Sequence, residues 1–203
     1  MNIKIFDTII TLSYPLMTGL TLILVIDYTG MAFCCILSAV CHELGHILAI
    51  KYYNAPIKEI NLSVFDINIK DLEKFKRPLK AEIIVTLSGV FVNIVLFLLA
   101  IMVYNSSNLY IMKYFAMANL YLGIFNALPV ETLDGGNALQ IVLQRNFSDK
   151  AVYIISTVVS LVFVIPLVII GFLILLRSPY NFTMFGSALY LISAIVSRII
   201  NAY

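Results

Sequence analysis

The stretch His42-Glu43-Leu44-Gly45-His46 lies within the apolar segment from Met31 to Ile50 and contains the only two histidines in the chain. On a helix, residues four apart lie one turn above one another on the same face, so the two imidazoles can share one metal ion. Glu43 lies beside them, where its carboxylate can hold a water molecule. Ionisable groups inside a membrane segment are costly and are usually functional. The alternative is that both are hydrogen-bonded core histidines on a helix face.

The composition places the chain among membrane proteins. Of its 203 residues, 62% are hydrophobic and 12% are charged, and the mean hydropathy is +1.00. Soluble domains are nearer half apolar and a quarter charged. The net charge of +2 is small and the basic residues cluster in one loop, which excludes nucleic acid as the expected partner. Cys34, Cys35 and Cys41 share one apolar segment, which favours buried thiols over disulfides.

Apolar runs of about 20 residues are long enough to cross a bilayer as helices. The sequence contains six such runs, and we expect an all-α polytopic membrane protein that forms a single membrane-embedded domain over residues 1–203. Pro15 and Pro166 are expected to kink the first and fifth spans. The predicted spans are Ile5–Ile26, Met31–Ile50, Ile83–Tyr104, Tyr114–Val130, Ala151–Leu176 and Met184–Ile200.

The positions of lysine and arginine predict the orientation of these spans, because basic residues concentrate in cytoplasmic segments. With the N-terminus inside, the inner segments hold all 13 basic residues except Lys113 and Arg177. We therefore expect both termini and the charged loop Lys51–Lys80 to be cytoplasmic.

The loop between the second and third spans contains a period-two pattern. Ile60, Leu62 and Val64 alternate with polar neighbours, and the alternation resumes one position out of phase at Phe65. This pattern predicts a strand or hairpin that carries a bulge. The following stretch, Lys70–Lys80, is predicted to be a solvated basic segment at the lipid headgroups.

Two histidines leave a catalytic zinc site one protein ligand short of the usual three. With a rise of 1.5 Å per residue, His46 lies about 7 Å and His42 about 13 Å from the inner end of their span. The fourth span also runs inward and is broken by Pro129, which brings Asp134 to a similar depth. We therefore expect Asp134 to be the third ligand.

Asp134 has a second interpretation. It could be the N-cap of a helix that starts near Asn137, and one carboxylate can serve both purposes. Gly135 and Gly136 follow it, and they permit a tight turn and a close approach of the backbone.

His42-Glu43-Leu44-Gly45-His46, together with Asn126-Ala127-Leu128-Pro129 and Leu133-Asp134-Gly135-Gly136, resembles the site-2 protease family of intramembrane zinc metalloproteases, peptidase family M50. The six-span layout is similar to the bacterial stage IV sporulation protease branch. The resemblance implies a bacterial cell membrane, zinc held by His42, His46 and Asp134, and Glu43 as catalytic base. It also implies that Asn126 binds substrate or steadies the oxyanion, and that a β-element at Ile57–Ile69 dips into the membrane.

Some positions depart from the family pattern. Ser88-Gly89-Val90-Phe91-Val92-Asn93 resembles the family's Gly-Pro-x-x-Asn stretch, with Val90 in place of proline. Asn137 stands where arginine is common. Glu131 is also atypical and is interpreted as a solvated loop charge. Because no regulatory CBS or PDZ-type domain is expected in this sequence, a regulatory membrane protein remains an unidentified partner.

The predicted reaction is zinc-assisted hydrolysis of peptide bonds in membrane-spanning protein substrates, with Glu43 taking a proton from water. Two alternatives keep the same fold: a non-catalytic membrane protein that binds clients, and a metal carrier. Glu43 argues against both, because a binding protein needs no base there and a carrier usually repeats its ligands along a path.

Overall fold

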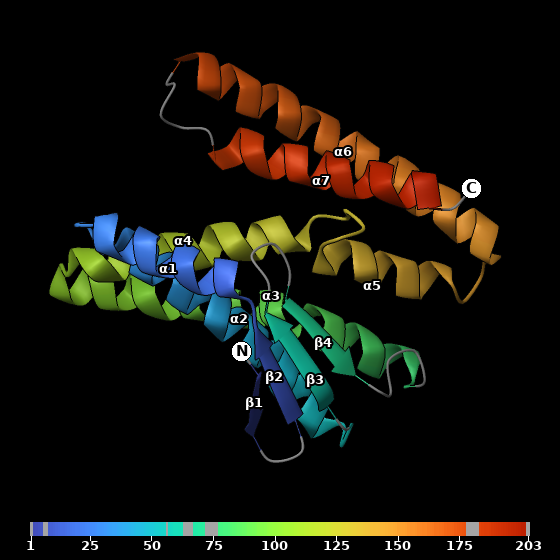
Figure 1. Cartoon of the computed structure of the whole chain (residues 1–203), viewed down its shortest axis with the longest axis horizontal. Coiled ribbons are helices and arrows are strands. Elements are labelled where there is room, and N and C mark those ends of the chain that lie inside the picture. The colour runs from blue at the N-terminus through green and yellow to red at the C-terminus, as the bar shows by residue number, and fades with distance from the viewer. Residues whose placement is uncertain are drawn as a thin grey trace. The chain divides into compact units, whose positions relative to one another are not determined.

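The computed structural model describes residues 2–5, 8–55, 57–62, 67–71, 77–177 and 183–201. The chain divides into two compact units, Met1–Ile124 and Phe125–Tyr203. The described strands are β1 (Asn2–Ile5), β2 (Thr8–Leu12), β3 (Ile57–Leu62) and β4 (Ile67–Asp71). The described helices are α1 (Tyr14–Ile26), α2 (Met31–Tyr52), α3 (Leu79–Ser107), α4 (Tyr110–Ala127), α5 (Asp134–Leu143), α6 (Asp149–Arg177) and α7 (Thr183–Asn201) (Figure 1).

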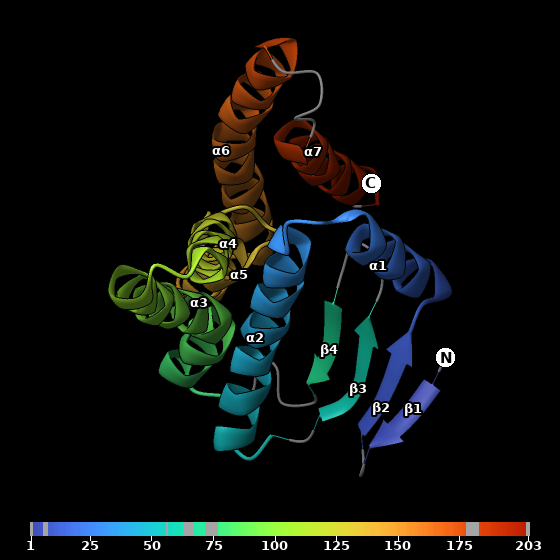
Figure 2. The ribbon, with the colours of Figure 1, turned by 90° about the vertical axis from the view of Figure 1, so that its left-hand side faces the viewer.

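The strands form one sheet in the order β1-β2-β3-β4 (Figure 2). β3 and β4 are antiparallel and occupy the loop for which the alternating pattern predicts a strand or hairpin. A register shift lies between Ile57 and Glu59. The sequence places the bulge near Val64 and Phe65, and those two positions lie outside the described residues.

The N-terminal strands correct the predicted first span. We expected a helix from Ile5 to Ile26, but β2 extends to Leu12 and pairs in parallel with β3. The β-branched run Thr8-Ile9-Ile10-Thr11 favours a strand. The expected kink at Pro15 is also wrong, because Pro15 lies in the first turn of α1, where the missing N–H group has no cost.

Three described helices, α2, α3 and α6, are long and apolar enough to cross a membrane. Their outer faces carry large exposed apolar side chains, such as Phe91 on α3 and Val162 on α6. In water such faces would be costly, whereas lipid solvates them. α1 and α7 are apolar but shorter.

Capping interactions determine where α2 begins. Asp27 accepts hydrogen bonds from the Thr29 hydroxyl at 2.6 Å, the Thr29 N–H at 2.9 Å and the Ala32 N–H at 2.6 Å. The Thr29 hydroxyl, together with these backbone donors, lowers the pKa of the Asp27 carboxyl. Gly30 then adopts a positive φ of 75°, which glycine tolerates without strain.

α3 begins beside a buried ion pair. Arg77 Nε lies 2.8 Å from Glu82 Oε2, and the two side chains are 7% and 4% exposed. The expectation of a solvated basic stretch is therefore wrong for Arg77, because its partner Glu82 allows it to be buried. Residues 72–76 of that stretch lie outside the described residues.

α2 and α3 pack closely because glycines lie at their crossing. A Cβ atom on Gly45 would lie 2.9 Å from Val92 Cγ2 and 3.2 Å from Gly89 Cα. Small residues let two membrane helices approach through their backbones. This crossing brings the histidine face of α2 against α3.

In the second unit, α6 and α7 lie side by side (Figure 1) and pack around an apolar core. Val130 and Val164 are fully buried, and Leu191 and Ile195 are each 1% exposed. At the other end of the helix pair, a Cβ atom on Gly171 would lie 2.9 Å from the Phe185 backbone.

We predict that Gly171→Ala lowers the free energy of unfolding by about 1 to 3 kcal/mol, because the added methyl forces the two helices apart. Gly186→Ala is the matched control, since a Cβ atom there meets nothing within 4 Å. It should be neutral or stabilise α7 by up to about 1 kcal/mol. Unfolding measured in detergent for both variants checks this, and an unaffected Gly171→Ala would contradict the helix packing.

Candidate metal centre

His42 and His46 project from α2 toward α3 and face one another. Their ring centroids are 4.9 Å apart with the planes nearly perpendicular, and His42 is only 4% exposed. The two Nε2 atoms are 3.2 Å apart. In a neutral imidazole one nitrogen carries the proton and the other has a free lone pair. The hydrogen-bond partners of the two Nδ1 atoms therefore determine whether the Nε2 atoms can bind a metal ion.

The tautomer of His46 follows from a backbone carbonyl. His46 Nδ1 lies 2.9 Å from the Val85 carbonyl oxygen, which can only accept a hydrogen bond. Nδ1 therefore carries the proton and donates it. The Ser88 hydroxyl lies 3.3 Å from the same nitrogen and donates to the same carbonyl at 2.7 Å. In the neutral imidazole, Nε2 of His46 is left with a lone pair.

The tautomer of His42 follows from a chain of amides. Asn119 on α4 donates from Nδ2 to the Phe115 carbonyl at 2.9 Å, so its Oδ1 faces the other way. That oxygen accepts a hydrogen bond from Asn93 Nδ2 at 2.8 Å. Asn93 Oδ1 therefore points at His42 Nδ1, at 2.5 Å, and must accept its proton. Asn93 and Asn119 are fully buried.

Both histidines in their neutral form thus direct an unprotonated Nε2 toward the same point. Two lone pairs 3.2 Å apart repel one another unless a cation lies between them. Two imidazole nitrogens that bind one tetrahedral zinc ion at about 2.1 Å lie about 3.4 Å apart. The observed separation is close to that value, so the pair fits zinc. In metal sites, a histidine that binds through Nε2 usually donates its Nδ1 proton to a carbonyl or carboxylate oxygen, as both do here.

Gly89 on α3 leaves the space that this pair needs. A Cβ atom at this position would lie 2.5 Å from His46 Nε2 and 2.6 Å from His42 Nε2. Any side chain here would therefore occupy the point at which the two lone pairs converge. The sequence resemblance includes Gly89 and Asn93 without giving either a role, and Asn119 was missed because no local motif marks it.

The other predicted site residues lie as follows. Glu43 is half-buried on α2, next to His42. Asn126 lies near the end of α4, and Asp134 is the first residue of α5; both are half-buried and belong to the second unit. The N-cap of α5 is Leu133, so the prediction that Asp134 caps a helix starting near Asn137 is wrong. The structure therefore brings His42 and His46 together within the first unit.

The glycines after Asp134 allow close packing of the backbone within the second unit. A Cβ atom on Gly135 would collide with the Ala127 carbonyl, and one on Gly136 would collide with the Val130 carbonyl. Only glycine fits at these positions. The start of α5 is thereby held against the chain that follows α4.

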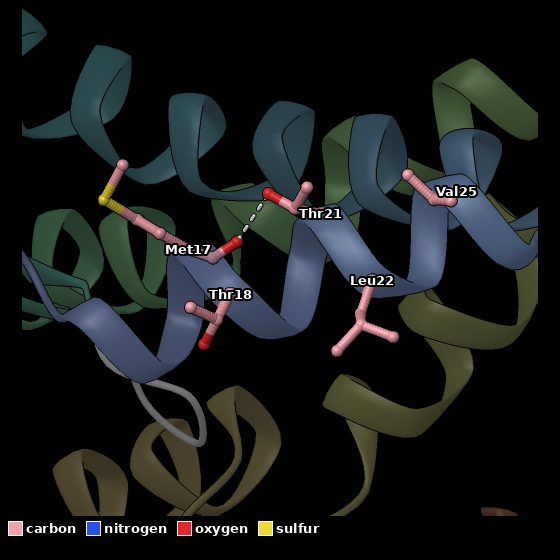
Figure 3. Close-up of a pocket in the computed structure, with 5 residues that line it drawn as sticks. All are labelled: Met17, Thr18, Thr21, Leu22 and Val25. Carbon is pink, nitrogen blue, oxygen red and sulfur yellow. Dashed lines mark hydrogen bonds between the residues drawn. The ribbon is translucent and has the colours of Figure 1, made fainter.

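A groove of about 440 Å³ beside α1 is a poor alternative site (Figure 3). It is lined by Met17, Thr18, Thr21, Leu22 and Val25. The hydroxyls of Thr18 and Thr21 donate to carbonyls of their own helix. With no titratable side chain among its lining residues, this groove has no group for acid–base or metal chemistry.

Part of the chain is similar to known peptidases. A model of peptidase family M50 matches residues 103–167, which include Asn126 and Asp134. The chain is 29% identical over 132 residues to stage IV sporulation protein FB of Bacillus subtilis, covering 64% of this chain and 46% of that protein. It is 28% identical over 116 residues to a zinc metalloprotease of Methanocaldococcus jannaschii, covering 54% of this chain and 33% of that protein.

The fold is also that of a solved structure, the site-2 protease from Methanocaldococcus jannaschii. The TM-score is 0.69 at 20% identity, over 97% of this chain and 94% of the other. Over part of its length the chain is similar to peptidase family M50, and its fold is that of the site-2 protease structure. The chain spans less than half the length of the two relatives matched by sequence.

We predict that Gly89→Ala abolishes most zinc binding by this protein, because the methyl group enters the space between the two Nε2 atoms. Gly19→Ala is the control, since a Cβ atom there meets nothing within 4 Å. Elemental analysis of both purified variants, with circular dichroism to verify the helices, checks this. A Gly89→Ala protein that is folded and retains full zinc would contradict the proposed position of the metal.

Proposed function

We propose that this protein is a zinc-dependent intramembrane endopeptidase, which hydrolyses peptide bonds of membrane-spanning proteins. The observation that carries the proposal is the pair of imidazole Nε2 atoms, 3.2 Å apart, on an apolar helix long enough to cross a membrane. Glu43 lies on the same helix between the two histidines. The match of residues 103–167 to peptidase family M50 supports the same reaction.

The proposed metal ligands are His42, His46 and Asp134. Two imidazoles and one carboxylate are a common ligand set for catalytic zinc and leave a coordination position open. The Leu133-Asp134-Gly135-Gly136 motif and its location within the M50 match support Asp134 as the third ligand. A bound zinc ion would supply Lewis acidity toward the scissile carbonyl and toward water.

The proposed catalytic base is Glu43. Its carboxylate accepts a proton from water as the water oxygen attacks the scissile carbonyl, and it then protonates the departing amine. Asn126 has an amide N–H that can donate to the oxyanion formed on the substrate. We propose this role for Asn126 from the family resemblance and from its position near the end of α4.

We propose that both compact units form one protease domain of six membrane helices, with both termini in the bacterial cytoplasm. The exposed apolar faces of α2, α3 and α6 support a membrane location. The distribution of lysine and arginine supports the orientation. The helices α1, α4 and α7 would complete the set of six spans.

We further propose that the substrate binds as an extended strand beside the sheet. A helical substrate hides its carbonyls in hydrogen bonds, so it must unwind before cleavage. In the described sheet, β4 is an edge strand, and its outer side offers backbone groups for a new strand. A membrane-associated sheet would hold the unwound substrate segment in the extended form that cleavage requires.

The alternatives of a client-binding protein or a metal carrier predict a different outcome when Glu43 is changed. Neither requires a base, so both would keep their function in Glu43→Gln. A regulatory membrane protein would fit any of the three functions and does not separate them.

We predict that Glu43→Gln retains zinc and fold but loses proteolysis. The amide preserves the shape of the side chain and cannot accept the water proton, and general-base catalysis contributes roughly a hundred- to ten-thousand-fold. The measurement is co-expression of wild type or variant with a panel of single-span membrane proteins encoded nearby, followed by gel analysis of the fragments.

Asp149→Asn is the matched control, because it removes an exposed carboxylate at the start of α6 and should leave cleavage unchanged. Cleavage that a chelator does not stop, or that persists in Glu43→Gln, would refute the mechanism. If wild type cleaves no protein of the panel, the client-binding alternative is favoured.

A further inference from the structure

Glu131, which the sequence suggests is a solvated loop charge, is buried in the second unit. The residue is 8% exposed and its side chain 4%. It lies in the turn between α4 and α5, three residues before Asp134. A buried carboxylate is costly unless donors and a cation surround it, so its partners show what it does.

Three donors converge on one oxygen of Glu131. Oε1 accepts hydrogen bonds from the Ser156 hydroxyl at 2.6 Å and the Thr157 hydroxyl at 3.4 Å, both on α6. It also forms an ion pair with Arg198 Nη1 on α7. The Arg198 guanidinium lies over the Tyr153 ring, 5.1 Å from its centre. One carboxylate thus joins the turn to both helices.

The backbone of the same turn is held as well. The Glu131 N–H donates to the fully buried Ser160 hydroxyl on α6 at 3.0 Å. A backbone N–H outside regular structure needs such a partner where water is excluded. Val130 and Leu133, on either side, are 0% and 8% exposed and belong to the apolar core between α6 and α7.

This turn leads directly into α5. The Leu133 N–H donates to the Val130 carbonyl at 2.8 Å, and the Asn137 N–H donates to the Leu133 carbonyl at 3.0 Å. Asp134 follows Leu133 as the first helical residue. A shift of the turn therefore shifts Asp134.

We infer that Glu131 is a positioning residue for Asp134, and that its ion pair with Arg198 is the bridge by which α7 determines where that carboxylate lies. The inference rests on the proposed role of Asp134 as a metal ligand. Apolar residues of similar size can match a buried ion pair in stability. The contribution of the pair is the defined position of the turn, because the pair requires the turn, α6 and α7 to meet in one arrangement.

The test separates this role from simple stabilisation. In Glu131→Gln, the Ser156 hydrogen bond can persist, but Arg198 loses its counter-ion. Arg198→Met leaves the carboxylate without its cation. Both single variants should be less stable and bind zinc more weakly, by roughly 10- to 100-fold as for other groups that orient metal ligands.

The double variant Glu131→Gln/Arg198→Met gives the decisive comparison. It has no unbalanced charge, so most of the lost stability should return. It also has no bridge, so zinc affinity should stay low. Zinc affinity is measured by competition with a chromogenic chelator on purified protein in detergent, beside the unfolding curve of each variant. If zinc affinity returns together with stability, the pair is only structural and the inference is wrong.

Phe185→Leu is the matched control. Phe185 packs against Phe172 at the opposite end of the α6–α7 pair, with ring centroids 5.8 Å apart. This variant should lower stability and leave zinc affinity unchanged. An equal loss of zinc in Phe185→Leu would show that any loosening of the helix pair has this effect, which would overturn the role given to Glu131.

A metal-free measurement distinguishes failure of this inference from failure of the proposed function. Hydrogen exchange of the segment from Val130 to Asp134, without zinc, should be faster in the double variant than in wild type. Wild type that binds no zinc would refute the metal centre, whereas unchanged exchange in the double variant would refute the bridge.

Discussion

The rest of the site depends on where the protons of two imidazoles lie. Val85 and Asn93, both on α3, accept hydrogen bonds from Nδ1 of His46 and His42. The lone pairs of the two Nε2 atoms, which are 3.2 Å apart, are therefore directed at the same point. Asn119 on α4 and Ser38 on α2 accept hydrogen bonds from Asn93 Nδ2, and this leaves Asn93 Oδ1 facing His42. Three helices therefore determine the metal-binding form of one histidine pair, and the network is costly to bury unless every member is satisfied.

Close backbone contact is the second requirement, and glycine provides it. Gly45 and Gly89 let α2 and α3 cross closely enough for the hydrogen bonds to His42 and His46 to form. Within the second unit, Gly135 and Gly136 let the start of α5 pack directly against the backbone at Ala127 and Val130. In lipid, where apolar burial gives little drive for helices to associate, such contacts and polar hydrogen bonds are what hold helices together.

The sequence predicts the long helices and the proximity of the two imidazoles on α2 well, because apolar length and the spacing of His42 and His46 are local properties. Prediction from the sequence fails where contacts with residues distant in the chain determine the secondary structure or the burial of a side chain. β2 is a strand because β1 and β3 pair with it. Glu131 and Arg77 are buried because Arg198 and Glu82 neutralise them. The roles of Asn93 and Asn119 depend on the register between α2, α3 and α4, which no local pattern in the sequence specifies.

We propose that zinc is held by two imidazole nitrogens and a carboxylate, and X-ray absorption at the zinc edge measures these ligands directly. The spectrum of the purified protein should show nitrogen and oxygen ligands only, at about 2.0 to 2.2 Å, with the outer-shell scattering of two imidazoles. In Asp134→Ala the two imidazoles should remain if any zinc is retained. A sulfur ligand at about 2.3 Å would instead place the metal at a cysteine such as Cys41 and contradict the account.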